Sequence, residues 1–228
     1  MSNVFQYHPA VLERYPSLRA GVILLSNLHN HATPDSLEQA YLQEQRAVIA
    51  RIGQTPLSEI PSLAAWRAAF RLFGVDPTQY RSAAEALLRR LTKKGDIPCI
   101  NALVDLCNLV SIRYALPVAA FDLRALQLPV TVQFAQGAER YTPLGEASLE
   151  HPPAGEVVFA DQTGLVIARR WCHRQSEESA AQLDTTTALL TVEAHHSGAD
   201  ADIRQAVDDL TRLVGEFVGG EIQVLRAG

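Results

Sequence analysis

The sequence has little of what marks secreted, metal-binding or membrane-spanning proteins. It contains three cysteines, Cys99, Cys107 and Cys172, an odd number without the CxxC spacing of a disulfide framework or a zinc site. No apolar run is long enough to span a membrane, and the N-terminus lacks the charged and apolar regions of a signal peptide. We therefore expect a cytoplasmic protein with no membrane partner, no metal and no cofactor.

Positive charge is also scarce. The formal net charge is -5 at pH 7, so the chain as a whole does not attract nucleic acid, and contact with RNA would require a local basic patch. Hydrophobic residues make up 47% of the chain and charged residues 20%, which is typical of a globular protein with a real core. Polar linkers, repeats and low-complexity segments are missing, which favours one compact domain over residues 1–228.

The hydrophobic pattern changes along the chain from helical to strand periodicity. After an apolar strand over 22–28, three helices are expected, at 33–52 with Thr33 as its cap, at 62–74 and at 82–94. From Val130 onward the pattern predicts strands over 130–134, 156–160, 165–170 and 185–193, an amphipathic helix over 200–218 and a last short strand over 221–225. The expected fold is an α/β domain with N-terminal helices packed on a β-rich C-terminal half.

One stretch, from Pro98 to Asp122, places polar residues inside an otherwise apolar run. If residues 102–114 are helical, Asp105 and Asn108 share one face, one turn apart. Burying them costs free energy unless both find partners. We expect Asp105 to accept hydrogen bonds from loop amides and so to have a structural role.

The positions of Cys107 and of the paired histidines indicate ordinary structural roles. Cys107 lies in the apolar helix without an identifiable base, so a packed thiol with a normal or raised pKa is the favoured interpretation. His29 and His31 have no acidic or thiol partner nearby, and His195 and His196 would point to opposite faces of an extended chain. We therefore expect both pairs at the surface rather than on a metal.

Two basic segments are candidates for contact with RNA. Arg169, Arg170, Trp171 and Arg174, with His173, could hold phosphates and stack an unpaired base, although basic residues also protect an edge strand from pairing. The second segment lies at the end of the 82–94 helix and contains Arg89, Arg90, Lys93 and Lys94. It is explained equally well by the helix dipole and by a phosphate-contacting patch.

The central stretch resembles a known family. Its pattern I-N-x-x-V-D-x-x-N, followed by P-x-x-A-F-D, is similar to the central motif of the tRNA-editing domain in the beta subunit of bacterial phenylalanyl-tRNA synthetase, the B-three/B-four domain. The resemblance covers about residues 21–193 and is specific at Ile100, Asn101, Val104, Asp105, Asn108, Pro117, Ala120, Phe121 and Asp122. It implies a layered α/β (α+β) fold with a β-sandwich core and flanking helices.

The resemblance also implies a site. Asn108 and Glu193 match the catalytic positions, Asp105 and Asp122 match structural ones, and the substrate-binding positions would be Cys107, Ala119, Arg169, Arg170, Trp171 and Arg174. The chain departs from the family in three places. Cys107 stands for a threonine, Ala119 for a frequent histidine, and the segment from Arg169 to Arg174 for a glycine-rich turn.

Three functions follow as hypotheses. The first is a hydrolase that deacylates mischarged aminoacyl-tRNA in trans, with the 3′ end of the tRNA as its partner and a synthetase as a second candidate partner. The second is a non-catalytic RNA-binding or synthetase-associated module, which the loss of the histidine at Ala119 would suit. The third is a hydrolase or binder of a free amino-acid derivative, which the acidic net charge would suit.

Overall fold

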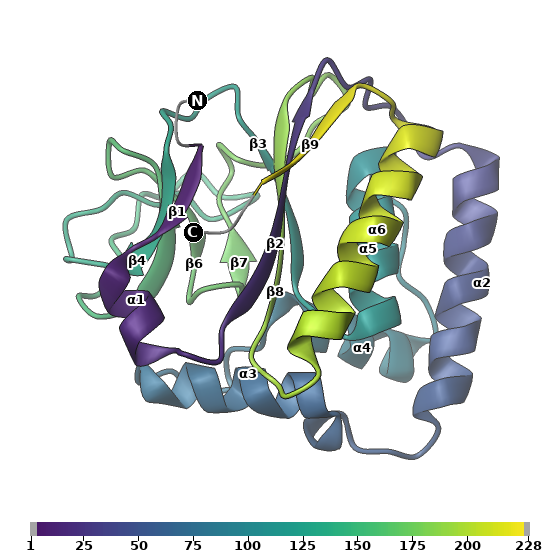
Figure 1. The fold of residues 1–228 in the computed structure, drawn as a ribbon, viewed down its shortest axis with the longest axis horizontal. Helices are drawn as coiled ribbons and strands as arrows, with labels where there is room; N and C mark the ends of the chain where they lie inside the picture. The colour runs from purple at the N-terminus through teal and green to yellow at the C-terminus, as the bar shows by residue number, and fades with distance from the viewer. Residues whose placement is uncertain (1–3, 226–228) are drawn as a thin grey trace.

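Two β-sheets and a layer of helices make up the computed structural model, which describes residues 4–225 (Figure 1). One sheet has five strands in the order β1 (Phe5–Tyr7), β4 (Val130–Phe134), β5 (Val157–Ala160), β6 (Val166–Arg169) and β7 (Arg174–Gln175). The other has four strands in the order β3 (Val118–Asp122), β8 (Ala188–Ala194), β2 (Arg19–Ser26) and β9 (Glu221–Leu225). Neighbouring strands are antiparallel except β1 and β4, which are parallel.

Most helices cover the outer face of the four-stranded sheet. In Figure 1 the helices α2, α5 and α6 form a layer on one side of this sheet, and α3 closes the space below the two sheets. The described helices are α1 (Pro9–Arg14), α2 (Asp35–Ile52), the 3-10 turn η1 (Leu57–Glu59), α3 (Pro61–Leu72), α4 (Ala83–Lys94), α5 (Ala102–Tyr114) and α6 (Ala199–Phe217). The fold class predicted from the sequence is confirmed.

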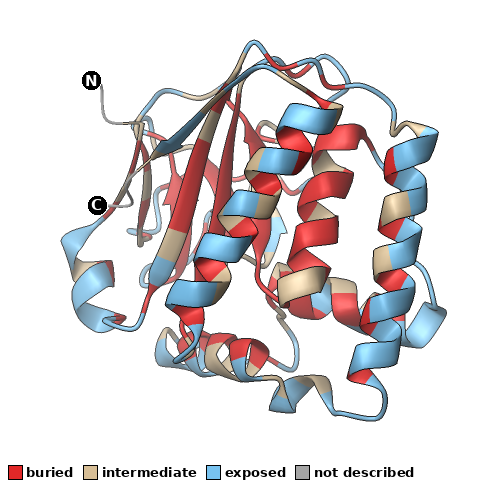
Figure 2. Ribbon diagram, turned by 45° about the vertical axis from the view of Figure 1, so that its right-hand side comes forward, coloured by how far each residue is buried: buried red, intermediate tan, exposed pale blue. Residues whose placement is uncertain are grey.

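The alternation of strand β8 separates two cores. Ala188, Leu190 and Val192 face the helices and belong to a large aliphatic cluster with α2, α5 and α6. Leu189 faces the opposite way, into an aromatic-rich cluster between the two sheets. Every residue of β8 is buried, and the strands of this sheet are largely red in Figure 2. Each fully buried aliphatic side chain stabilises the folded state by about 1.5–3 kcal/mol. The odd-numbered residues of β8 therefore point toward the five-stranded sheet.

The close approach of α6 to β2 depends on Gly21. A Cβ atom at this position would lie 2.3 Å from Val207 Cγ2 and 3.0 Å from Val192 Cγ1. Val207 is on α6 and Val192 on β8, so a side chain at Gly21 would separate the helix from the sheet. Glycine is required here for the space it leaves and not for its backbone freedom.

Two sequence-based expectations fail near the N-terminus. The prediction that Thr33 caps the helix is wrong, because α2 begins at Asp35 without a side-chain cap. The Thr33 hydroxyl donates to Asp105 Oδ2 instead. A buried carboxylate is the stronger acceptor, which explains the difference. Strand β1 and helix α1 were not foreseen. Strand β1 is the edge strand of the five-stranded sheet, paired with β4, and α1 contacts β4. Between Val4 and Leu225, no helix has the length and apolar character needed to cross a membrane.

Candidate functional site

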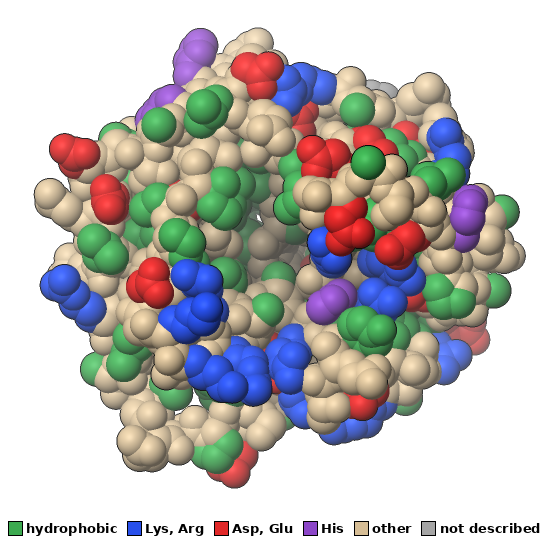
Figure 3. Space-filling view, turned by 180° about the vertical axis from the view of Figure 1, so that it is seen from behind, with side chains coloured by type: hydrophobic (Ala, Val, Ile, Leu, Met, Phe, Trp, Pro, Cys, Tyr) green, Lys and Arg blue, Asp and Glu red, His purple; other side chains and the backbone are tan. Residues whose placement is uncertain are grey.

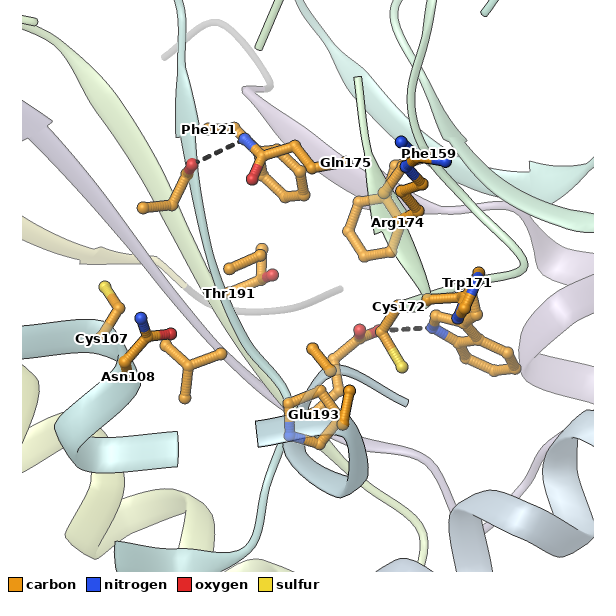
Figure 4. Close-up of a pocket in the computed structure, with 18 of the residues that line it drawn as sticks. Cys107, Asn108, Phe121, Phe159, Trp171, Cys172, Arg174, Gln175, Thr191 and Glu193 are labelled. Carbon is orange, nitrogen blue, oxygen red and sulfur yellow. Dashed lines mark hydrogen bonds between the residues drawn. The ribbon is translucent and has the colours of Figure 1, made fainter. Parts of the chain in front are cut away.

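A pocket of about 300 Å³ opens where α4 and α5 meet the ends of β3, β8 and β7. A hollow is visible near the centre of the face shown in Figure 3, with Lys and Arg side chains gathered below it. The close-up in Figure 4 shows Cys107 and Asn108 on one wall, Trp171, Cys172 and Arg174 on the opposite wall, and Thr191 and Glu193 between them. The other lining residues that matter below are Ala83, Ala86, Leu87, Ala119, Phe121, His173 and Gln175.

Helix α5 is fixed at its start by a network of buried side chains. Asn101 caps the helix by accepting from Val104 N at 3.0 Å, and Asn30 donates to Asn101 Oδ1 at 3.0 Å. Asn30 Oδ1 in turn accepts from Leu103 N at 3.0 Å. The first turn therefore has its free amides satisfied by side chains, which sets the position of the helix.

Asp105 completes this network from inside the first turns of α5. Its carboxylate accepts from Ile100 N at 3.0 and 3.1 Å and from the Thr33 hydroxyl. Burial raises its pKa above the ordinary value, while these hydrogen bonds lower it. Asp105 does not line the pocket, whereas Cys107 and Asn108 do. Its contacts are those of a carboxylate that holds a loop against the helix.

Asp122 ties the end of β3 to the segment before β8. Its carboxylate accepts from Arg124 N at 2.8 Å and from Thr185 Oγ1 at 2.5 Å, and it forms an ion pair with the Arg124 guanidinium at 2.8 Å. Because β3 and β8 are neighbours and both line the pocket, this contact fixes the register of two of its walls.

Glu193 is the buried carboxylate of the pocket. Its Oε1 accepts from Tyr7 Oη at 2.7 Å and from Trp171 Nε1 at 3.0 Å. Burial raises its pKa to about 7, and the two hydrogen bonds act in the opposite direction. Within residues 4–225, no group donates a hydrogen bond to Oε2. Glu193 therefore exchanges its proton nearer to neutral pH than an exposed carboxylate does, and it has one oxygen left for a ligand.

Trp171 does not have the role expected of it. The side chain is fully buried, in edge-to-face contact with Tyr15, Trp66 and His195 at centroid distances of 4.8, 5.2 and 5.0 Å. A ring packed in this way cannot stack on an unpaired base at the surface. The indole positions Glu193 instead, through its Nε1 hydrogen bond.

The turn that carries Trp171 is backbone-strained. Arg170 and Trp171 have positive φ angles of 45° and 60°, a left-handed conformation that costs a residue with a Cβ roughly 1–2 kcal/mol. Arg170 N donates to Glu156 Oε1 at 2.8 Å, which helps to hold the turn. The sequence suggested that a glycine-rich turn had been replaced here, and the replacement keeps a glycine-like backbone.

The three candidate arginines have different environments. The expectation that Arg169 contacts RNA is wrong, because it is buried and its guanidinium donates to both oxygens of Glu156, at 3.1 and 3.0 Å. Arg170 lies over the Tyr80 ring at 3.8 Å, outside the pocket. Arg174 lines the pocket, is exposed, and pairs with Glu146 at 2.9 Å. Of the three, Arg174 alone both lines the pocket and reaches solvent.

The two thiols of the pocket, Cys107 and Cys172, are buried or partly buried, and burial raises the pKa of both. Protonated thiols are poor nucleophiles, in line with the expectation for Cys107. Among the residues that the structure describes, no cluster of three His, Cys, Asp or Glu side chains could hold a metal ion.

The histidine pair at the end of β8 lies differently from the expectation. His195 is not a surface residue: it is buried among Trp66, Trp171 and Tyr15, and burial lowers its pKa to about 4. His196 contacts Asp202 at 2.8 Å. The alternation of an extended chain places His195 on the same side as Glu193, between the two sheets.

Three pocket features were missed from the sequence. Gln175 Nε2 donates to Ala120 O at 2.9 Å and to Ser179 O at 2.6 Å, which leaves its Oε1 as an acceptor (Figure 4). Tyr7 reaches Glu193 from the N-terminal strand, 186 residues away in sequence. Thr191 lies two residues before Glu193 and lines the pocket with it. No local sequence pattern signals contacts between such distant segments.

His173 supplies an imidazole to the pocket from the strained turn. Its Nδ1 lies 2.8 Å from Arg81 O, and because a carbonyl can only accept, Nδ1 carries the hydrogen and Nε2 has the lone pair. Burial lowers its pKa, and the nearby Arg170, Arg174 and Arg169 lower it further. The hydrogen bond to the Arg81 carbonyl acts in the opposite direction and raises the pKa, but the net shift is downward and favours the neutral ring. The sequence had suggested His173 only as part of a basic segment.

Comparison with known proteins assigns the family. The model of the B3/4 domain matches residues 65–218, more than half of the chain, so the protein belongs to the B3/4 domain family. The match begins later than the expected resemblance and extends through α6. The phenylalanine–tRNA ligase beta subunit of Chromobacterium violaceum is 26% identical over 156 residues, which span 60% of this chain and 20% of that protein.

A solved structure has the same fold. An N-terminal fragment of the phenylalanyl-tRNA synthetase beta subunit from Pyrococcus horikoshii superimposes with a TM-score of 0.54 over 100% of this chain and 52% of that chain. The two are 13% identical, so the likeness concerns the fold.

Proposed function

We propose that the protein is an aminoacyl-tRNA hydrolase that clears mischarged tRNA in trans. The observation that carries the proposal is a pocket of about 300 Å³ that contains a buried carboxylate, Glu193, with hydrogen-bond donors to only one of its two oxygens. The pocket lies in a B3/4 domain whose match covers a fifth of the synthetase relative. The volume is at the lower end of the range for small-molecule pockets, which suits an amino-acid residue. The partner would be the 3′ end of a cytoplasmic aminoacyl-tRNA.

The acceptors of the pocket support a substrate with hydrogen-bond donors. Glu193 Oε2 and Gln175 Oε1 are both acceptors without a donor from the rest of residues 4–225. A hydroxyl or an ammonium group of the amino acid would satisfy them. A site built to pair such a group discriminates strongly against a substrate that lacks it, because its buried acceptor is then left unpaired. Ala119, in place of the family's histidine, leaves room on the adjoining wall.

The hydrolytic step requires an oriented water and a stabilised oxyanion. An aminoacyl ester is already labile, so positioning and electrostatic stabilisation suffice, without a metal or a covalent enzyme intermediate. In this proposal His173 Nε2 accepts a proton from the attacking water, and the Asn108 amide donates to the carbonyl oxygen as it becomes negative. The proton then passes to the ribose oxygen of the tRNA 3′ end as its ester bond to the amino acid breaks. Glu193 holds the amino acid, and Arg174 lies at the mouth for the RNA.

The second candidate function is a non-catalytic RNA-binding or synthetase-associated module. The observation that favours it is Ala119, which removes the imidazole that the family often has on β3. The presence of His173 in the same pocket, from a different element, argues against it.

A deacylation screen over mischarged tRNAs tests the proposal. We expect the wild type to hydrolyse at least one mischarged pair. Asn108→Ala and His173→Ala should each lower kcat about 10²–10³-fold, in the range for loss of one oxyanion donor or one general base. Glu193→Gln should change amino-acid preference more than tRNA affinity.

His29→Ala is the matched control, since His29 is exposed and outside the pocket. Because the pKa of His173 is lowered, hydrolysis should persist below pH 6.5 and fall at lower pH as the ring gains a proton. No hydrolysis of any pair by the wild type, together with retained tRNA binding, would favour the non-catalytic module.

A further inference from the structure

A second hollow, of about 440 Å³, lies along a different face of α4 from the pocket. Ala83, Ala86 and Leu87 face the pocket, whereas Arg89 and Lys93 line the second hollow. Its remaining charged residues are Arg67 from α3, Arg81 from the turn before α4, and Glu85. We propose that this hollow, called here the α4 groove, binds backbone phosphates of the RNA whose 3′ end enters the pocket.

The α4 groove has a clear excess of positive charge. Its four cations face a single carboxylate, Glu85, which is buried and already paired with Arg67 at 2.6 Å. Arg89 and Lys93 are exposed, and neither has an ion pair within the described part of the chain. On a protein with a net charge of -5, this is the kind of local basic patch that contact with RNA requires.

The inner arginines are oriented by the backbone. Arg81 donates from Nη2 to Thr78 O at 2.5 Å, and Arg67 donates from Nη1 to Pro77 O at 3.3 Å. Arg81 Nε is buried and finds no hydrogen-bond acceptor in residues 4–225, and it lies 3.9 Å from Glu85 Oε1. A buried donor without an acceptor is costly, and a phosphate oxygen would supply the missing acceptor.

The helix dipole does not account for this arrangement. Lys93 lies in the last turn of α4, where a cation suits the negative end of the helix. Arg67 belongs to another helix and Arg81 precedes the first turn of α4, where the dipole favours negative charge instead. Arg81, Glu85, Arg89 and Lys93 are spaced by four residues, which forms one stripe along the groove.

The position of the groove favours RNA over a small anion. The groove and the pocket share α4 as a wall, and a helix with its side chains is about 10–12 Å across. An aminoacyl end in the pocket would therefore leave the phosphates of the next few nucleotides beside Arg89 and Lys93. Arg81 connects the two sites, since its side chain lines the groove and its carbonyl oxygen accepts from His173. This inference rests on the proposed function for the identity of the RNA.

The test compares two double variants of the full chain. Arg89→Ala/Lys93→Ala removes the exposed, unpaired cations of the groove. Arg46→Ala/Arg204→Ala removes two cations that are likewise exposed and unpaired in the described region, but lie on α2 and α6. Affinity for uncharged tRNA is measured by fluorescence anisotropy over a series of salt concentrations.

We expect the groove variant to bind tRNA about tenfold or more weakly at low salt. Its slope of log affinity against log salt should fall by about 1–2, because two phosphate contacts are lost. The control variant should retain the wild-type affinity and slope. Equal tRNA binding by both double variants would overturn the inference. So would a groove variant that loses stabilisation by inorganic phosphate in a thermal shift assay while its tRNA binding is unchanged.

Deacylation separates this inference from the proposed function. If the wild type hydrolyses a mischarged tRNA, the groove variant should raise KM about tenfold and leave kcat at saturating tRNA within about twofold, as expected for lost ground-state binding. Hydrolysis by the wild type with no effect of the groove substitutions on binding or KM would leave the function standing and reject the groove. Weakened tRNA binding by the groove variant, with no hydrolysis by the wild type, would support the groove and reject the hydrolase.

Discussion

At the scale of single residues, the candidate site depends on side chains whose protonation is set by burial. Glu193 is kept largely protonated below pH 7 because the space between the sheets disfavours its charge. His195, two residues later, is kept neutral by the same environment. Burial shifts the two pKa values in opposite directions, so ionising Glu193 as pH rises and protonating His195 as pH falls both cost stability.

The pH dependence of stability provides a test of the Glu193 environment. Its pKa is raised from 4.5 to about 7 on folding, so the folded state binds the proton more tightly. The resulting stabilisation is complete below pH 4.5 and is lost as pH rises through 7. We expect the free energy of unfolding of Glu193→Gln, relative to wild type, to increase by roughly 3 kcal/mol between pH 4.5 and 8.

Urea denaturation of both proteins at a series of pH values measures this difference. Taking the difference between variant and wild type removes the contribution of His195, which both proteins share. Glu13→Gln, at an exposed carboxylate, is the control and should track the wild type. A difference between Glu193→Gln and wild type that does not change with pH would mean that Glu193 is solvated rather than buried.

At the scale of secondary structure, the packing of α6 on the four-stranded sheet positions β8 and therefore Glu193. This packing depends on the small residue at Gly21, where a Cβ would meet Val207 at 2.3 Å and Val192 at 3.0 Å. Val207 has few accessible rotamers because it is β-branched, so it cannot easily turn aside.

We expect Gly21→Ala to lower the free energy of unfolding by about 1–3 kcal/mol, as for other overpacked cores. Adding Val207→Ala should recover part of the loss, since it removes the clashing methyl groups. Thermal or urea denaturation of the two single variants and the double variant gives the coupling energy. Strictly additive effects would show that the two residues do not meet, contrary to the structure.

At the scale of the whole molecule, the two cores share strands. Val22 packs between the sheets while its neighbour Ile23 packs against the helices, and Leu189 and Leu190 divide in the same way. Neither core can lose its packing without exposing strands that belong to the other. The pocket lies where both cores meet, so its walls depend on the integrity of both.

We therefore expect the chain to unfold in one cooperative transition. Tryptophan fluorescence reports the core between the sheets through Trp66 and Trp171, and far-ultraviolet circular dichroism reports mainly the helices. The two signals should give the same midpoint and the same slope with urea. Two separate midpoints would mean that the cores are independent and that the chain is not a single folding unit.

The sequence by itself determined those parts of the protein whose cause is local. The helix over 102–114 and the strand over 130–134 were predicted with the bounds they have, because hydrophobic periodicity is set by neighbouring residues. The motif from Ile100 to Asp122 was enough to indicate the family. It also led to Cys107, Asn108 and Ala119, and the segment 185–193 led to Glu193; the fold brings all four into one pocket.

Tertiary structure decided everything that depends on which distant residue becomes a neighbour. Arg169 and Trp171 were expected to face RNA but are buried, because Glu156 and Glu193 lie where they satisfy the guanidinium and the indole. The carbonyl of Arg81, 92 residues earlier, orients the His173 imidazole, and burial lowers its pKa. Burial and partner choice set the charge and direction of a polar side chain, and neither is encoded in the few residues on either side of it.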